Sequence, residues 1–152
     1  KDTLVGRAIA ILVAEGSDAA LIKKIQKAVT GAGAMVKIIA PKIGGVKLSD
    51  GSLLPANGQL AGSPSVLFDA IAVILSDSGA KALAKEGAAI DFVRDAYGHL
   101  KAIALDEGGR ALLKSANVDN DAAVLDAKES NAFIAAAKTR QWAREKLVRT
   151  LA

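Results

Sequence analysis

Short apolar runs alternate along this chain with longer segments in which apolar residues recur every three or four positions. Runs of the first kind are typical of strands buried on both faces, and they predict strands at 7–13, 35–40, 68–75 and 101–105. The second pattern predicts helices at 19–30, at 110–115 and at 141–151, and another that ends at residue 137. It also predicts helical structure from about residue 76 to 97, with a possible break at Gly87. This alternation predicts an α/β fold, a three-layer sandwich with a mainly parallel sheet and helices on both faces.

The first predicted helix has the clearest boundaries and faces. Ser17 or Asp18 can cap its start, and glycines end it at residues 31–33. We expect one face to be buried and the other, rich in lysine, to be exposed. The buried face comprises Leu21, Ile22, Ile25, Ala28 and Val29, and the exposed face comprises Lys23, Lys24 and Lys27.

Three other segments have weaker signals. Residues 41–64 are rich in Gly, Pro, Ser and Asn, and within them 46–48 and 52–54 predict a hairpin whose Asp50-Gly51 turn has positive φ. Residues 117–125 fit either a short strand or a polar loop. Ser130 or Asn131 can cap the helix that runs through residue 137.

Composition narrows the class of protein. The 152 residues suit one domain, without internal repeats or a domain boundary, and 51% apolar with 24% charged residues is ordinary for a globular chain. With no cysteine, disulfides, thiolate nucleophiles and thiolate metal sites are excluded, and the single histidine, His99, excludes any site that needs two imidazoles. No apolar run has membrane-spanning length, and Lys1–Thr3 do not begin a signal peptide, so we expect a cytoplasmic location. Because the only methionine is Met35, we also expect a fragment of a longer polypeptide.

The net charge of +4 arises entirely at the C-terminal end. Residues 128–152 contain six basic and two acidic residues, whereas the rest of the chain is balanced. Such a segment could meet nucleic acid, an anionic membrane or an acidic protein surface. Only Trp142 lies among these charges to offer stacking, so we expect a solvated or partner-facing helix, and neither nucleic acid nor membrane as a partner.

Three loops at the carboxyl ends of the predicted strands are the places to look for chemistry. Residues 14–18 match neither a dinucleotide-binding glycine pattern nor a P-loop. The hydroxyls of residues 76–79 are explained by helix capping.

The third loop, residues 105–109 (LDEGG), has the place of a nucleophile elbow but contains no Ser, Cys or Thr. His99 lies at the other end of that strand, and Asp106 with Glu107 is a weak basis for a metal site. We therefore assign no catalytic, cofactor-binding or metal-binding residue. We expect a structural turn with ordinary backbone angles at Asp106.

Several motifs carry a family resemblance. They are residues 4–7 (LVGR), 50–55 (DGSLLP), 61–65 (AGSPS), 68–73 (FDAIAV) and 95–104 (DAYGHLKAIA). In this order they resemble the C-terminal domain of large-subunit haem catalases of the hydroperoxidase II type. The resemblance extends over nearly the whole chain and is weakest beyond about residue 117.

The resemblance implies a single flavodoxin-like domain over residues 1–152, related to the ThiJ/PfpI and class I glutamine amidotransferase proteins, with the catalase core absent. By this resemblance, the nucleophilic cysteine of ThiJ/PfpI enzymes falls at or next to Asp106, and their acidic partner falls near Leu21. Both are replaced here, so that catalytic apparatus is not carried over. The haem pocket belongs to the core domain, and Tyr97 and His99 belong to a different motif from its ligands.

The function that this resemblance implies is a non-catalytic accessory domain that supports folding, stability or assembly. The parent would be a haem catalase that converts hydrogen peroxide to water and oxygen, and the partners would be its core domain and the neighbouring subunits of a homotetramer. Two alternatives stay open: a holdase that binds unfolded chains, and a ThiJ/PfpI-type hydrolase.

Overall fold

A computed structural model describes residues 3–118 and 124–139. Its main sheet has six parallel strands in the order β5-β2-β1-β6-β7-β8. The strands are β1 (Ala8–Val13), β2 (Met35–Ala40), β5 (Gly58–Gln59), β6 (Ala70–Ile74), β7 (Ala102–Leu105) and β8 (Val124–Asp126). Without the two-residue edge strand β5, the order is that of a flavodoxin-like sheet, in which the second strand precedes the first and the rest follow in sequence. The predicted fold class is confirmed.

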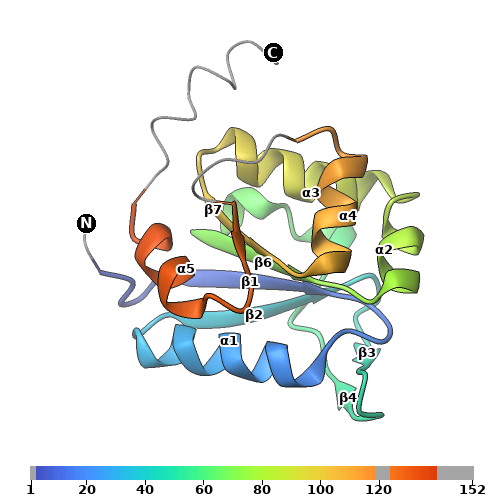
Figure 1. Ribbon diagram of the computed structural model, residues 1–152, viewed down its shortest axis with the longest axis horizontal. Coiled ribbons are helices and arrows are strands. Elements are labelled where there is room, and N and C mark those ends of the chain that lie inside the picture. Colours follow the sequence, from blue (N-terminus) through green and yellow to red (C-terminus); the bar gives the residue numbers. More distant parts are fainter. Residues whose placement is uncertain (1–2, 119–123, 140–152) are drawn as a thin grey trace.

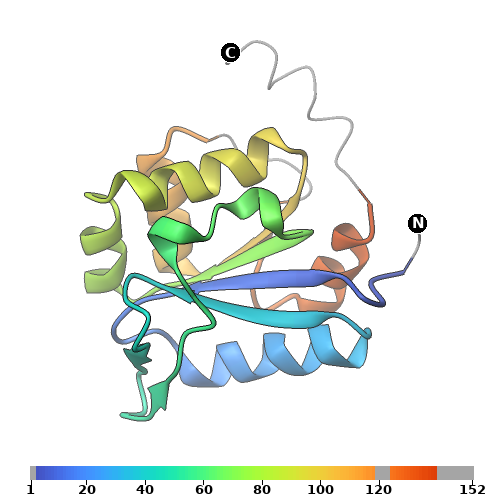
Figure 2. The ribbon, with the colours of Figure 1, turned by 180° about the vertical axis from the view of Figure 1, so that it is seen from behind.

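Helices cover both faces of the sheet (Figures 1 and 2). They are α1 (Ala19–Gly31), α2 (Asp77–Leu83), α3 (Gly87–Gly98), α4 (Glu107–Ser115) and α5 (Ser130–Ala137), with short 3-10 turns η1 (Leu60–Gly62) and η2 (Ser65–Leu67). α1 and α5 lie on one face, and α2, α3 and α4 lie on the other (Figure 1). This gives the three layers that the pattern predicts.

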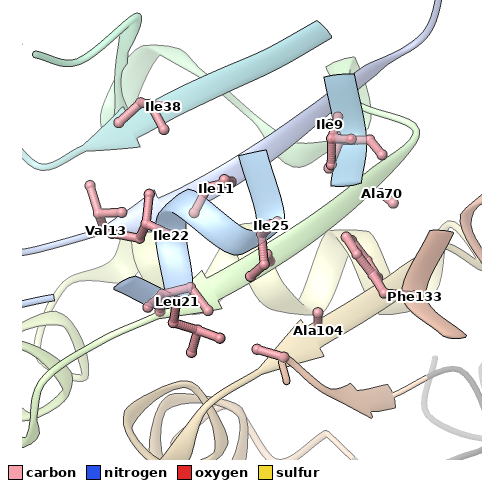
Figure 3. Close-up of a cluster of buried hydrophobic side chains, with 14 of the residues drawn as sticks. Ile9, Ile11, Val13, Leu21, Ile22, Ile25, Ile38, Ala70, Ala104 and Phe133 are labelled. Carbon is pink, nitrogen blue, oxygen red and sulfur yellow. The ribbon is translucent and has the colours of Figure 1, made fainter. Parts of the chain in front are cut away.

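The core is divided between the two faces because successive side chains of a strand point in opposite directions. In β1, Ile9, Ile11 and Val13 pack toward α1 and α5, whereas Ala10 and Leu12 pack toward the other helices. Figure 3 shows the first cluster, in which Ile22 and Ile25 of α1 and Phe133 of α5 approach the sheet. The central strands are buried on both sides, which is why the sequence shows them as continuous apolar runs.

The first helix has the predicted faces and the predicted cap. Asp18 is the N-cap, and its carboxylate accepts the backbone N–H of Leu21 at 3.0 Å. Leu21, Ile22, Ile25 and Val29 are buried, Ala28 is half-buried, and the three lysines are exposed. The predicted hairpin also forms, between β3 (Val46–Lys47) and β4 (Leu53–Leu54), with Gly51 at φ +85°.

Three expectations from the sequence are corrected. Residues 58–59, expected in a loop, form β5, because the side chain and backbone of Asn57 both bond to Ile38 and align the next residues with β2. α4 begins at Glu107 rather than at residue 110. The capping of α5 by Ser130 or Asn131 is wrong, since its N-cap is Glu129, which makes no side-chain capping bond.

Two further expectations concern the C-terminal third. Residues 117–125 fit either a short strand or a polar loop by sequence, and the structure has a short strand, β8, at Val124–Asp126. The helix expected at 141–151 lies outside the described residues.

Ser17 connects the carboxyl ends of two neighbouring strands. It is fully buried, its hydroxyl donates to the carbonyl oxygen of Ile74 at 2.5 Å, and it accepts the backbone N–H of Ala14 at 3.0 Å. The side chain therefore joins the loop after β1 to the end of β6, although the sequence indicates it only as a possible helix cap.

Replacing Ser17 should destabilise the fold. Ser17→Ala leaves a buried carbonyl and a buried N–H without this partner, so we expect a loss of about 1–3 kcal/mol in the free energy of unfolding. Ser115→Ala is the matched control, since the Ser115 hydroxyl is exposed and bonds only to the backbone of its own helix. Urea denaturation followed by circular dichroism measures both variants, and equal stabilities would contradict the structural role of Ser17.

Candidate functional site

A pocket of about 510 Å³ lies at the carboxyl ends of the central strands, where open parallel sheets place their ligand sites. We call it the carboxyl-edge pocket. It is lined by Gly16, Asp18, Leu21, Ser49, Leu75, Ser76, Asp106, Glu107, Arg110, Asp126 and Lys128. All three loops singled out from the sequence meet here.

Asp106 connects β6 to α4 at one side of this pocket. As the N-cap of α4 it accepts the backbone N–H of Gly109 at 2.8 Å, and both of its carboxylate oxygens lie 3.1 Å from the backbone N of Leu75. Its backbone is extended, with φ −95° and ψ −168°, which confirms the expectation of ordinary angles. The carboxylate is thus held by backbone donors from two elements.

Burial raises the pKa of the Asp106 carboxyl above its ordinary value of 3.8. The N–H groups of Gly109 and Leu75 act in the opposite direction because they stabilise the charged form, and the charge of Asp18 adds a small upward contribution. Loss of hydration is the dominant effect on this side chain.

The glycines that follow Asp106 allow α4 to approach the sheet closely. A Cβ on Gly108 would lie 2.1 Å from the carbonyl oxygen of Leu75, and one on Gly109 would lie 2.3 Å from that of Val73. The Gly-Gly pair, which the sequence indicates as a turn, therefore forms the first turn of a helix packed backbone-to-backbone on β6.

The other two loops are explained by local structure. Ser76 is the N-cap of α2, where it accepts the N–H of Gly79 at 3.0 Å and donates to the carbonyl of Glu15 at 2.8 Å. This confirms the capping interpretation of its hydroxyl. Leu21 lies in the same pocket as Asp106, so the two positions matched by resemblance to the ThiJ/PfpI site are brought together.

The charged groups of the pocket are mixed. Arg110 and Lys128 line it together with four acidic residues, and Arg110 lies 3.9 Å from Asp126. The acidic residues are Asp18, Asp106, Glu107 and Asp126. Within residues 3–118 and 124–139, no group of three or more His, Cys, Asp or Glu side chains is placed to hold a metal ion. His99 is the C-cap of α3, before the amino end of β7, and Tyr97 is buried in α3. Neither lines the carboxyl-edge pocket.

Known structures share this fold. Drosophila melanogaster DJ-1beta superposes with a TM-score of 0.74 at 14% identity, over 96% of this chain and 97% of that one. A two-domain protein of Anabaena variabilis with DJ-1/ThiJ/PfpI-like and ferritin-like domains gives 0.69 at 17% identity, over 76% of this chain and 33% of its own. The fold is therefore that of the DJ-1/ThiJ/PfpI class.

Sequence relatives place the chain within a narrower family. Residues 5–141 match the model of the C-terminal domain found in long catalases, and the chain belongs to that family. Catalase C of Rhizobium meliloti is 35% identical over 150 residues, which are 95% of this chain and 21% of that protein. Catalase HPII of Pseudomonas putida is 37% identical over 144 residues, 92% of this chain and 20% of that protein. The chain thus spans about a fifth of the length of the catalases it matches.

The part of the chain that the structure describes contains no helix with both the length and the apolarity to cross a membrane.

The raised pKa of Asp106 predicts a pH-dependent effect of neutralising this side chain. A folded-state pKa above the unfolded value means that the folded form binds the proton more tightly, so the stability that Asp106 contributes is lost as pH rises from about 3.8 through its folded pKa. Asp106→Asn keeps an acceptor oxygen but does not titrate, so its stability relative to wild type should increase across that window and then level off.

The measurement is urea denaturation of both proteins between pH 3.5 and about 7.5, a range that brackets the ordinary carboxyl pKa. Asp91→Asn, on the exposed side of α3, controls for the general effect of removing one carboxylate. A difference that is constant with pH, or that falls as pH rises, would show that burial does not dominate at Asp106.

Proposed function

We propose that this chain is a non-catalytic accessory domain of a long catalase and that it supports the stability and assembly of that enzyme. Membership of the C-terminal domain family is the observation that carries the proposal. The rest of such a protein, about four-fifths of its length, would hold the haem and convert hydrogen peroxide to water and oxygen. Its core domain and the neighbouring subunits of a homotetramer would be the partners, in the cytoplasm.

The geometry at Asp106 supports the non-catalytic part of the proposal. By resemblance, ThiJ/PfpI enzymes carry their nucleophile at or next to this position. Here the carboxylate accepts backbone N–H groups from Gly109 and Leu75, and the partner position falls near the apolar Leu21. A side chain used in this way as a helix cap is poorly placed to attack a substrate.

A holdase is the second candidate, because several large apolar side chains are exposed. They are Val5, Met35, Ile43, Leu53, Val66 and Leu67, each 49–70% exposed. An isolated chain that suppresses the aggregation of an unfolded client at equimolar ratio would favour this function. Hydrolysis of a peptide or amide substrate that is abolished by Asp106→Asn would favour the ThiJ/PfpI-type alternative instead.

The isolated chain is expected to bind no haem and to turn over no peroxide. Haem needs an axial ligand, and of the two candidate side chains Tyr97 is buried in α3, while His99 is exposed at the end of that helix and outside the carboxyl-edge pocket. The purified chain should be incubated with haem, dialysed, and examined for a Soret band and for oxygen release from peroxide. A band that persists after dialysis, together with oxygen release, would contradict the proposal.

The accessory role is tested in the long catalase that carries this domain. Gly108→Ala/Gly109→Ala forces two methyl groups against the backbone of β6, and this overpacking should destabilise the domain by about 1–3 kcal/mol or more. We expect faster thermal inactivation and loss of assembled enzyme, with the turnover number per haem unchanged in the assembled fraction.

The matched control is Gly87→Ala/Gly98→Ala in α3, where added methyl groups meet nothing within 4 Å. Activity after heating and light scattering behind size exclusion compare the two double variants. If both inactivate at the wild-type rate while the first is shown to unfold the domain, the domain does not support the enzyme.

A further inference from the structure

Exposed apolar side chains gather at the edge of the sheet opposite the carboxyl-edge pocket. We call this the amino edge, because all six parallel strands begin there. Val5 and Met35 are 70% and 51% exposed, and they flank the start of β1 and β2, where Gly6 donates to the carbonyl of Gly33. Val66 and Leu67, 49% and 63% exposed, lie in η2 just before β6. Two neighbouring parts of one edge therefore present apolar surface to solvent.

A basic cavity of about 540 Å³ opens at the same edge. Arg7, Lys101 and Lys138 line it together with one carboxylate, Asp69. Asp69 already accepts the backbone N–H of Ala8 at 3.0 Å and lies 4.0 Å from Arg7. Among the described residues that line this cavity, the basic side chains outnumber the single carboxylate, which favours an added negative charge there.

Lys101 joins the basic cavity to the apolar residues beside it. The side chain is buried, and its ammonium group donates to the carbonyl oxygens of Ser65 at 3.2 Å and Val66 at 2.8 Å, and to that of Phe68. These bonds fix η2 over the amino end of β7. Val66 and Leu67 are thus exposed on a turn that is held in place, which reduces the ordering cost of binding a partner.

We propose that the amino edge docks on the catalase core of the same polypeptide, with an acidic side chain of the core entering the basic cavity. This rests on the proposed function. In a C-terminal domain the core precedes the domain, and the match to that family begins at residue 5, on this edge. The polypeptide that precedes this match in a long catalase would therefore enter the domain at the amino edge, and tethering there would raise the effective concentration of the core next to these residues.

Charge disfavours two other occupants of the amino edge. A second copy of the chain, packed about a two-fold axis, would place the same basic cavity on both sides of the interface, and like charges there oppose association. Residues 140–152 contain four basic residues and one acidic residue, so this segment has the same sign of charge as the cavity. An acidic surface of the core is the complementary choice.

Methionine oxidation tests the docking directly, because Met35 is the only methionine of this chain and lies on the amino edge. Leu53→Met adds a reference methionine on the β3–β4 hairpin, at a position 68% exposed and away from this edge. The long catalase with this substitution is oxidised with chloramine-T rather than with hydrogen peroxide, because a catalase would consume peroxide. The peptides that contain Met35 and position 53 are then quantified by mass spectrometry.

In the long catalase we expect Met35 to oxidise at least about tenfold more slowly than the methionine at position 53, because docking buries Met35 and removes oxidant access. In the 152-residue chain we expect the two methionines to oxidise at similar rates. Equal rates in the long catalase would overturn the docking proposal. Protection of Met35 in the 152-residue chain would also overturn it, in favour of a second copy if the chain dimerises and of residues 140–152 if it is monomeric.

The acidic contact is tested by charge reversal. Lys138→Glu should raise the oxidation rate of Met35 in the long catalase at least about threefold, because the cavity would then repel the acidic group, whereas Lys42→Glu, on an exposed loop, should not. No effect of Lys138→Glu would overturn the acidic contact.

A long catalase that depends on its domain for stability, yet leaves Met35 as reactive as position 53, would overturn this inference alone and leave the proposed function standing.

Discussion

The carboxyl end of β6, residues 73–76, is the point on which the surrounding loops depend. The hydroxyl of Ser17 joins it to the loop after β1, and the carboxylate of Asp106 joins it to the start of α4. Gly108 and Gly109 bring the backbone of α4 against its carbonyl oxygens. Because a parallel sheet has no hairpins to align its strands, side-chain contacts of this kind fix how the βα loops sit relative to one another.

This arrangement explains how a pocket can persist while its chemistry changes. The strand order and the close approach of α4 create the hollow at the carboxyl edge, and both depend on backbone geometry rather than on any reactive group. Asp106 contributes to that geometry as a cap, so its carboxylate serves the fold that surrounds the pocket. The DJ-1/ThiJ/PfpI fold is thereby kept at 14% identity to DJ-1beta, without the thiol that the resemblance places here.

The sequence predicts most of this fold because the central strands are buried on both faces and therefore appear as continuous apolar runs. It fails where tertiary contacts override local signals. Glycine disfavours a helix interior, so Gly108 and Gly109 indicate a turn, but their lack of side chains is what lets α4 begin against β6. β5 is missed because two residues carry no periodicity, and Asn57 aligns them through bonds to Ile38.

The two edges of the sheet differ in how far they can be seen from the sequence. The carboxyl-edge pocket is predictable, since strand ends locate its loops and resemblance places Asp106 and Leu21 together. The basic cavity is not, because Arg7, Lys101 and Lys138 are far apart in the chain and meet only where strands and α5 are aligned. An open parallel sheet places its ligand sites at the carboxyl ends of the strands. In a domain whose potential nucleophile position is used as a helix cap, an interaction through the amino edge would leave the carboxyl-edge pocket undisturbed.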